Sequence, residues 1–161
     1  MKKMIYILSI VVSFFIGMLY GKLKKKSADQ KIISAQTDEI NKFREFFGIL
    51  NYWLTLKEEN KNLEIYFQKY NYKTIAIYGM KDLGTHLYEE LKDSSIAVSY
   101  GIDKNADCIY ADIDVVFPNK NMPKVDAVVV TSIHYYQEIK AELQELTNVP
   151  IVSLADIMKE I

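Results

Sequence analysis

The sequence predicts the α/β class: a parallel sheet of five strands in the order 3-2-1-4-5 with helices on both faces, which is half of a doubly wound fold. After residue 72, segments that are apolar throughout alternate with amphipathic helical segments, as is typical of a parallel sheet covered on both sides. A turn that contains Gly79 and Gly84 joins the first of these strands to the first helix. An uncharged run and a helical neck come earlier, so we expect three parts: residues 1–26, 27–72 and 73–161.

The first part is predicted to be a membrane anchor. An uncharged run begins at Met4 and ends at Tyr20, which is close to the minimum length of a spanning helix. Two lysines precede the run and four follow it closely. The positive-inside rule therefore predicts a single-pass protein of the cell membrane with its C-terminal domain in the cytoplasm. A cleavable signal peptide is the alternative, but lysines lie where cleavage would occur.

The neck is predicted to be an amphipathic helix from residue 31 to about 57. Apolar residues recur in it every seven positions, with a second apolar series between them. They are Ile33, Ile40, Phe47 and Leu54, with Phe43 and Leu50 in the second series. Either this helix packs on its own domain, or it makes a homo-oligomer or docks on a membrane partner. A short helix with an apolar face follows and ends near Asn71.

The α/β domain is predicted from the order of its apolar segments. We expect strands at residues 74–78, 96–103, within 111–118, at 126–132 and within 149–154, and helices at 85–92 and from Tyr136 to about Leu146. Ser153 and Asp156 form a capping pair for a last short helix. Because crossovers are right-handed, a ligand crevice is expected at the carboxyl ends of the first and fourth strands.

The segment GMKDLG after the first strand departs from the G-x-G-x-x-G pattern of dinucleotide-binding loops. Gly79 and Gly84 match its first and third glycines, but Lys81 replaces the second, which lets the backbone approach a pyrophosphate. Two interpretations remain: a loop needed only for the fold, or an altered phosphate or nucleotide site at a helix N-terminus. The candidate loop residues are Gly79, Met80, Lys81, Asp82, Leu83 and Gly84.

Three more residues are candidates for this crevice. Asp103 ends the second strand at about the spacing at which an acidic residue meets a ribose, although it also suits an ordinary turn. Thr131 and His134 follow the fourth strand, at its carboxyl end. The cofactor is unknown from these residues; NAD and a nucleotide sugar are the candidates.

Four stretches of the chain resemble a Rossmann-like, NAD(P)-binding-type module of bacterial surface-polysaccharide biosynthesis proteins. The similarity covers about residues 43–161 and depends on FFGILNYWLTLKEENKNLEIYFQKYNYKTIAIYGMKDLGTHLYEEL, SYGIDKN, DAVVVTSIHYYQEIKAEL and VPIVSLADI. The resemblance implies an accessory protein that binds a nucleotide or nucleotide sugar in envelope glycan synthesis. It also implies a glycosyltransferase-type partner, which the neck helix would contact. A non-catalytic scaffold with a degenerate nucleotide site is the alternative, and an NAD-dependent sugar-modifying enzyme is less favoured.

The remaining patterns give no catalytic residue, no metal site and no nucleic-acid partner. Tyr136 and Lys140 have the Tyr-x-x-x-Lys spacing of short-chain dehydrogenases, but Tyr136 lies on the apolar stripe of its predicted helix. Two histidines and one cysteine do not make a zinc pattern. A net charge of -1 offers no basic field for nucleic acid.

Overall fold

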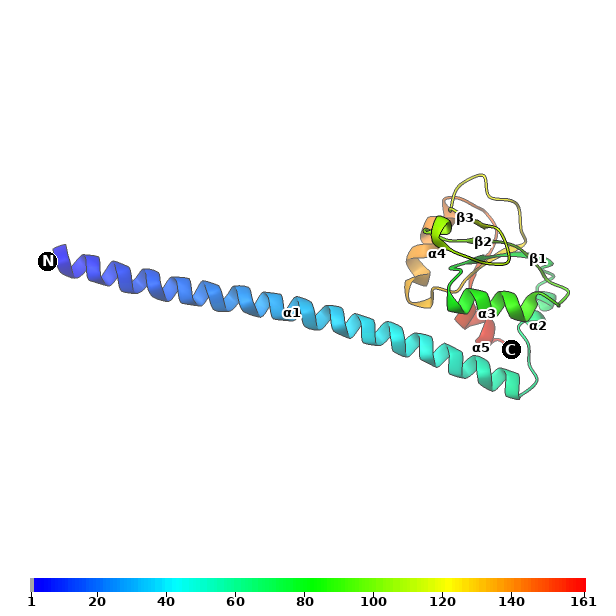
Figure 1. Cartoon of the computed structure of the whole chain (residues 1–161), viewed down its shortest axis with the longest axis horizontal. Coiled ribbons are helices and arrows are strands. Elements are labelled where there is room, and N and C mark those ends of the chain that lie inside the picture. The colour runs from blue at the N-terminus through cyan, green and yellow to red at the C-terminus, as the bar shows by residue number, and fades with distance from the viewer. Residues whose placement is uncertain (1) are drawn as a thin grey trace. The chain divides into compact units, whose positions relative to one another are not determined.

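The computed structural model describes the backbone of residues 2–161 and the side chains of residues 17, 18, 20, 24–27 and 29–161. The chain forms two compact units, Met1–Arg44 and Glu45–Ile161. The second unit contains a five-stranded sheet in the order β3-β2-β1-β4-β5, in which every pair is parallel (Figure 1). The predicted fold class and strand order are therefore confirmed.

The centre of the sheet is buried on both faces, and this explains why β1 and β4 are almost entirely apolar, whereas β2 is fully buried only in its second half and β3 is half-buried. Its strands are β1 (Thr74–Tyr78), β2 (Ala97–Ile102), β3 (Val115–Val116), β4 (Ala127–Val130) and β5 (Ile151–Ser153). Ile75 and Ile77 of the central strand β1 belong to one buried cluster, whereas Ala76 and Tyr78 belong to another. This alternation follows from the period of two in a strand.

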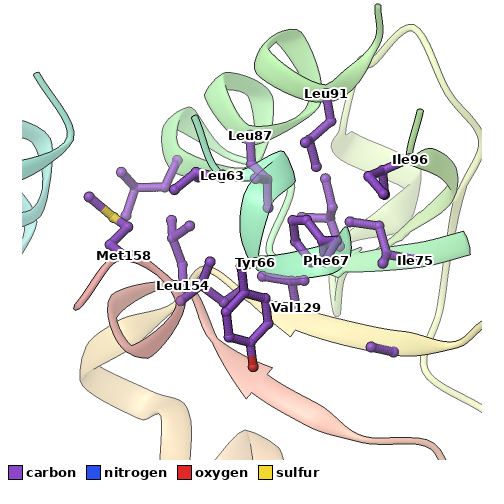
Figure 2. Packing of buried hydrophobic residues seen from close by; sticks show 14 of the residues in the cluster. Leu63, Tyr66, Phe67, Ile75, Leu87, Leu91, Ile96, Val129, Leu154 and Met158 are labelled. Atoms are coloured by element: carbon purple, nitrogen blue, oxygen red, sulfur yellow. The ribbon is translucent and has the colours of Figure 1, made fainter. Parts of the chain in front are cut away.

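Helices cover both faces of the sheet, as predicted. One buried cluster contains residues of α2 (Glu64–Lys69), α3 (Asp82–Leu91), α5 (Leu154–Lys159) and the end of α1 (Lys2–Glu58). The other contains residues of α4 (Tyr136–Gln144). Figure 2 shows Phe67 of α2, Leu87 and Leu91 of α3, and Leu154 of α5 in the first cluster.

The residues 45–72, expected in the neck, belong to the α/β unit. Trp53 and Leu56 of α1 are buried in its core, together with Leu63, next to the start of α2. The same helix carries exposed apolar residues at Ile33, Ile40, Phe43, Phe47 and Leu54. One helix thus has two kinds of apolar residue. Trp53 and Leu56 pack on the chain's own domain, whereas the exposed apolar residues remain available for another partner.

Two asparagines end the helices α1 and α2. Asn60 and Asn71 have φ values of 58° and 56°, the left-handed conformation that asparagine tolerates better than most residues. After each, the next N–H bonds back to the last turn: Lys61 N–H to Leu56 O at 2.9 Å and Tyr72 N–H to Phe67 O at 2.9 Å. Both ends are Schellman motifs, and the predicted stop at Asn71 is confirmed.

Some local boundaries differ from the predictions by a few residues, most clearly at the start of α3. Helix α3 begins at Asp82, not at residue 85, because its first turn is formed by the glycine-containing segment itself. The connection from β2 to β3 contains only the 3-10 turn η1 (Ala106–Cys108). At the last helix, Ser153 Oγ accepts the Ala155 N–H at 3.2 Å, which confirms the serine of the predicted capping pair, whereas the Asp156 carboxylate pairs with Lys159 at 3.9 Å.

The anchor predicted between Met4 and Tyr20 falls almost entirely outside the side chains that the structure describes. Within the described residues, no helix is long and apolar enough to span a membrane.

Candidate functional site

The β1–α3 loop turns at Gly79 and packs tightly against Gly84. Gly79 has φ +92°, in the region that favours glycine. A Cβ on Gly84 would lie 2.2 Å from the Gly79 carbonyl oxygen. The two glycines therefore have the local roles of the first and third glycine of a dinucleotide-binding loop, the turn and the close approach of helix to strand.

Asp103 connects this loop to the end of β2. Its carboxylate is buried: Oδ2 accepts the Met80 N–H at 3.3 Å, and Oδ1 accepts the Asn105 N–H at 2.8 Å. The second bond is the Asx-turn role that the sequence allows for an aspartate at a strand end. A ribose would have to reach oxygens that already accept protein hydrogens, on a residue that is 8% exposed.

Met80 lies between the loop and β2. Its side chain is 3% exposed. A Cβ on Gly101 of β2 would come within 2.4 Å of Met80 Cγ, so the glycine at 101 makes room for the methionine. The flexible thioether fills the space at this end of β2, and Leu83, in the first turn of α3, is also buried.

Lys81 and Asp82 are the exposed residues of the loop. Lys81 is the N-cap residue of α3, and no side chain makes a capping hydrogen bond there. The first N–H groups of a helix have no acceptor within the helix, and the helix dipole places partial positive charge at this end. An anion that approached Lys81 would meet favourable charge, whereas Asp82 would oppose it.

Thr131, after β4, holds the other side of the turn. Its Oγ1 donates to Gly79 O at 2.6 Å and lies 3.1 Å from Tyr78 O. The hydroxyl has one hydrogen, and it is used within the buried loop. The structure thus brings Gly79, Met80, Asp103 and Thr131 together in contacts that the protein itself satisfies.

His134 lies in the 3-10 turn η2 (Ile133–Tyr135) that follows β4, but it interacts with α1. Its Nδ1 is 3.0 Å from Glu45 Oε2, and its ring meets that of Tyr135 edge-on. The contact with Glu45 could not be predicted, because these two residues are far apart in the sequence. The helix α1 therefore reaches one of the candidate crevice residues.

Glu90 of α3 connects α1 and the start of α2 to the α/β domain, and the sequence did not predict this role. Its side chain is buried and accepts the Trp53 Nε1–H at 2.5 Å, the Leu63 N–H at 2.7 Å and the Lys57 ammonium at 2.5 Å. These donors belong to the end of α1 and the start of α2. One carboxylate therefore joins three helical segments, and its only sequence signal is an acidic residue one position before the buried Leu91.

A small cavity of about 120 Å³ lies between α3 and the segment that leads to β3. Thr85, Tyr88 and Glu89 form its α3 side, with Met80 at the loop. Tyr110, Ala111 and Asp112 form the opposite side. This volume is below that of the usual small-molecule site, which holds several hundred Å³.

Tyr136 and Lys140 do not form a proton-transfer pair. The Tyr136 hydroxyl donates to the Ile151 carbonyl of β5 at 2.9 Å, and the Lys140 ammonium lies over the tyrosine ring, 5.5 Å from its centroid. The tyrosine thus connects α4 to the sheet. Among the residues with described side chains, no group of three His, Cys, Asp or Glu could hold a metal ion.

Comparisons of the chain with protein-family models, with curated protein sequences and with solved structures find no match.

Proposed function

We propose that this protein is a membrane-anchored, non-catalytic accessory protein of cell-envelope polysaccharide synthesis, and that its Rossmann-like domain is an interaction module with a degenerate nucleotide site. The main support is the interior of the loop. Met80 fills the space against Gly101, and both Asp103 oxygens accept backbone N–H groups. In a working dinucleotide site the backbone of the loop approaches the pyrophosphate and the acidic residue contacts a ribose.

The ligand question is tested by calorimetry on the full chain in a mild detergent. We expect no heat of binding for NAD, coenzyme A, nucleoside diphosphates or nucleotide sugars at concentrations up to about 1 mM, which corresponds to binding weaker than about 4 kcal/mol. Thermal unfolding of the same sample would show that the domain is folded. Binding of any of these ligands in the micromolar range would contradict the degenerate site.

A second candidate, binding of a nucleotide or nucleotide sugar by its phosphates, is supported by one observation. Lys81 is exposed at the N-terminus of α3, where no side chain caps the helix. If a nucleoside diphosphate binds there, Lys81→Ala should weaken it about tenfold, as expected for one charge-assisted hydrogen bond. Lys92→Ala, next to the other end of the same helix, is the matched control and should leave the affinity unchanged. Equal effects of the two variants would contradict binding at Lys81.

The anchor and its orientation are part of the proposal and have their own test. Cys108 is the single cysteine of the chain and is exposed. With the α/β domain in the cytoplasm, a membrane-impermeant thiol reagent should label Cys108 only after the cells are permeabilised. The protein should also remain with the membrane fraction after an alkaline carbonate wash. Labelling in intact cells would reverse the orientation, and release by the wash would contradict the anchor.

A further inference from the structure

An apolar stripe lies on α1 within the unit Met1–Arg44. It consists of Ile33, Ile40 and Phe43, which we call the α1 stripe, and each of these side chains is more than half exposed. Residues at these spacings share one side of a helix. If Ile33 and Ile40 are a positions of a heptad, Phe43 is the following d position. Three large apolar side chains on one seam form a surface that two helices could share.

The charges beside the α1 stripe favour a second copy of this chain as its partner. In the same heptad, Glu39 is a g position and Arg44 is the following e position, and both are exposed. In a parallel two-stranded coiled coil, a g residue faces the following e residue of the other helix. Glu39 of one copy would then face Arg44 of the other, and by symmetry this pair would form twice. An antiparallel pair would instead place g against g and e against e.

The α/β core limits how far such a seam could extend. The next d position, Leu50, packs against the buried cluster of the α/β unit, and Trp53, a g position, is part of that cluster. Their side of the helix is covered by the chain's own domain. The free heptads therefore lie before residue 47, within the part of α1 that contains the stripe.

We propose that a second copy of this chain covers the α1 stripe, in a parallel two-stranded coiled coil over residues 33–44 with Glu39 paired to Arg44 across the interface. This inference names the partner for the interaction module, and its parallel direction rests on the proposed anchor, because two chains anchored in one membrane leave it in the same direction. Anchoring also raises the local concentration, so that a short coiled coil can associate.

The mass of the full chain in a mild detergent, measured by light scattering over a dilution series, tests the proposal. The wild type should be a dimer that dissociates on dilution. Ile40→Glu should weaken the dimer by about 100-fold, because it buries a charge in the seam. Ala35→Glu, at a c position away from the seam, is the matched control and should leave the mass unchanged.

Exchanging the charges of Glu39 and Arg44 tests whether the partner on the α1 stripe is a second copy of this chain or something else. Glu39→Arg and Arg44→Glu should each weaken the dimer by about tenfold, because each replaces two attractive pairs by two repulsive ones. The double variant restores both attractions and should return to near the wild-type affinity. A bilayer surface or an unrelated protein would not be restored by the exchange.

Three results would overturn the proposal: a monomeric wild type, a dimer that survives Ile40→Glu, or a double charge variant that does not recover. Calorimetry with nucleotides on the same sample reports separately on the proposed function. If the chain is monomeric and binds no nucleotide, the proposed function as an interaction module is retained, but its partner is not a second copy of this chain. If the chain is a dimer that binds a nucleotide, the proposed degenerate site is contradicted and the proposed coiled coil is not.

Discussion

Trp53 and Phe43 lie on the same helix, α1, but Trp53 is 6% exposed and Phe43 is 69% exposed. Trp53 packs with Leu56 and Leu63 in the α/β core, and its indole N–H donates to Glu90. Phe43 belongs to the other compact unit. Similar apolar residues in one helix therefore have different environments. The periodicity of a helix shows that it has an apolar face, but not what covers that face.

The largest expected effect is a direct comparison of these two residues. Trp53→Ala should lower the free energy of unfolding of the α/β unit by about 4 kcal/mol, because it empties a core position and removes a donor from buried Glu90. Phe43→Ala should change it by less than about 0.5 kcal/mol. Urea unfolding followed by circular dichroism measures both. A large effect of Phe43→Ala would contradict the difference between the two regions.

Glu90→Ala should have the next largest effect, about 3 kcal/mol, because it leaves the buried N–H groups of Trp53 and Leu63 without their acceptor. Glu89→Ala on the same helix is the matched control. Glu89 forms an exposed pair with Lys92, and its loss should cost less than about 0.5 kcal/mol. If both variants unfold at the same urea concentration, Glu90 does not hold the end of α1 on the domain.

Two helical glycines should respond in opposite directions. Gly84→Ala places a Cβ 2.2 Å from the Gly79 carbonyl oxygen, and we expect a loss of about 2 kcal/mol. Gly48 of α1 has nothing within 4 Å of the same position, so Gly48→Ala should raise stability by about 0.7 kcal/mol through helix propensity. Thermal unfolding of the two variants measures this. Equal losses would show that α1 is also closely packed at Gly48.

The smallest expected effect on stability is the loss of the Asp126 contribution at acid pH, and this residue lies outside α1. Asp126 Oδ2 accepts the backbone N–H groups of Thr74 and Lys73, both at 2.7 Å, and these bonds lower the pKa of Asp126 from its usual 3.8. Between the folded and unfolded pKa values the unfolded chain binds more protons, so stability falls as the pH drops below about 4. Asp126 is exposed, which keeps the effect small.

The difference in stability between pH 7 and pH 3.5 measures this contribution. Asp126→Asn should make that difference smaller than in the wild type, because the amide does not titrate. An unchanged difference would show that other carboxylates cause the acid sensitivity; Glu64 and Glu160, whose pKa values are also lowered by hydrogen bonds, would be the next to replace.

Much of the α/β fold could be predicted from single segments of the sequence. The first strand was expected at residues 74–78 and β1 has those bounds, because a short apolar segment between turn residues has few alternatives. The local roles of Gly79 and Gly84 were also predictable. The surroundings of the candidate site were not: Met80 lies against Gly101 of another strand, and His134 contacts Glu45 of α1. No local pattern indicates contacts between such distant residues.

The sequence by itself determined the class of the fold, the order of its strands, the end of α2 at Asn71 and the Ser153 cap of α5, because these depend on side-chain periodicity, handed crossovers and capping residues within a few positions. Only the tertiary structure decided which side of α1 is buried, where Glu90 finds its donors and what fills the loop beside Asp103. Those outcomes depend on close packing and on the need of buried polar groups for partners, which join residues far apart in the chain.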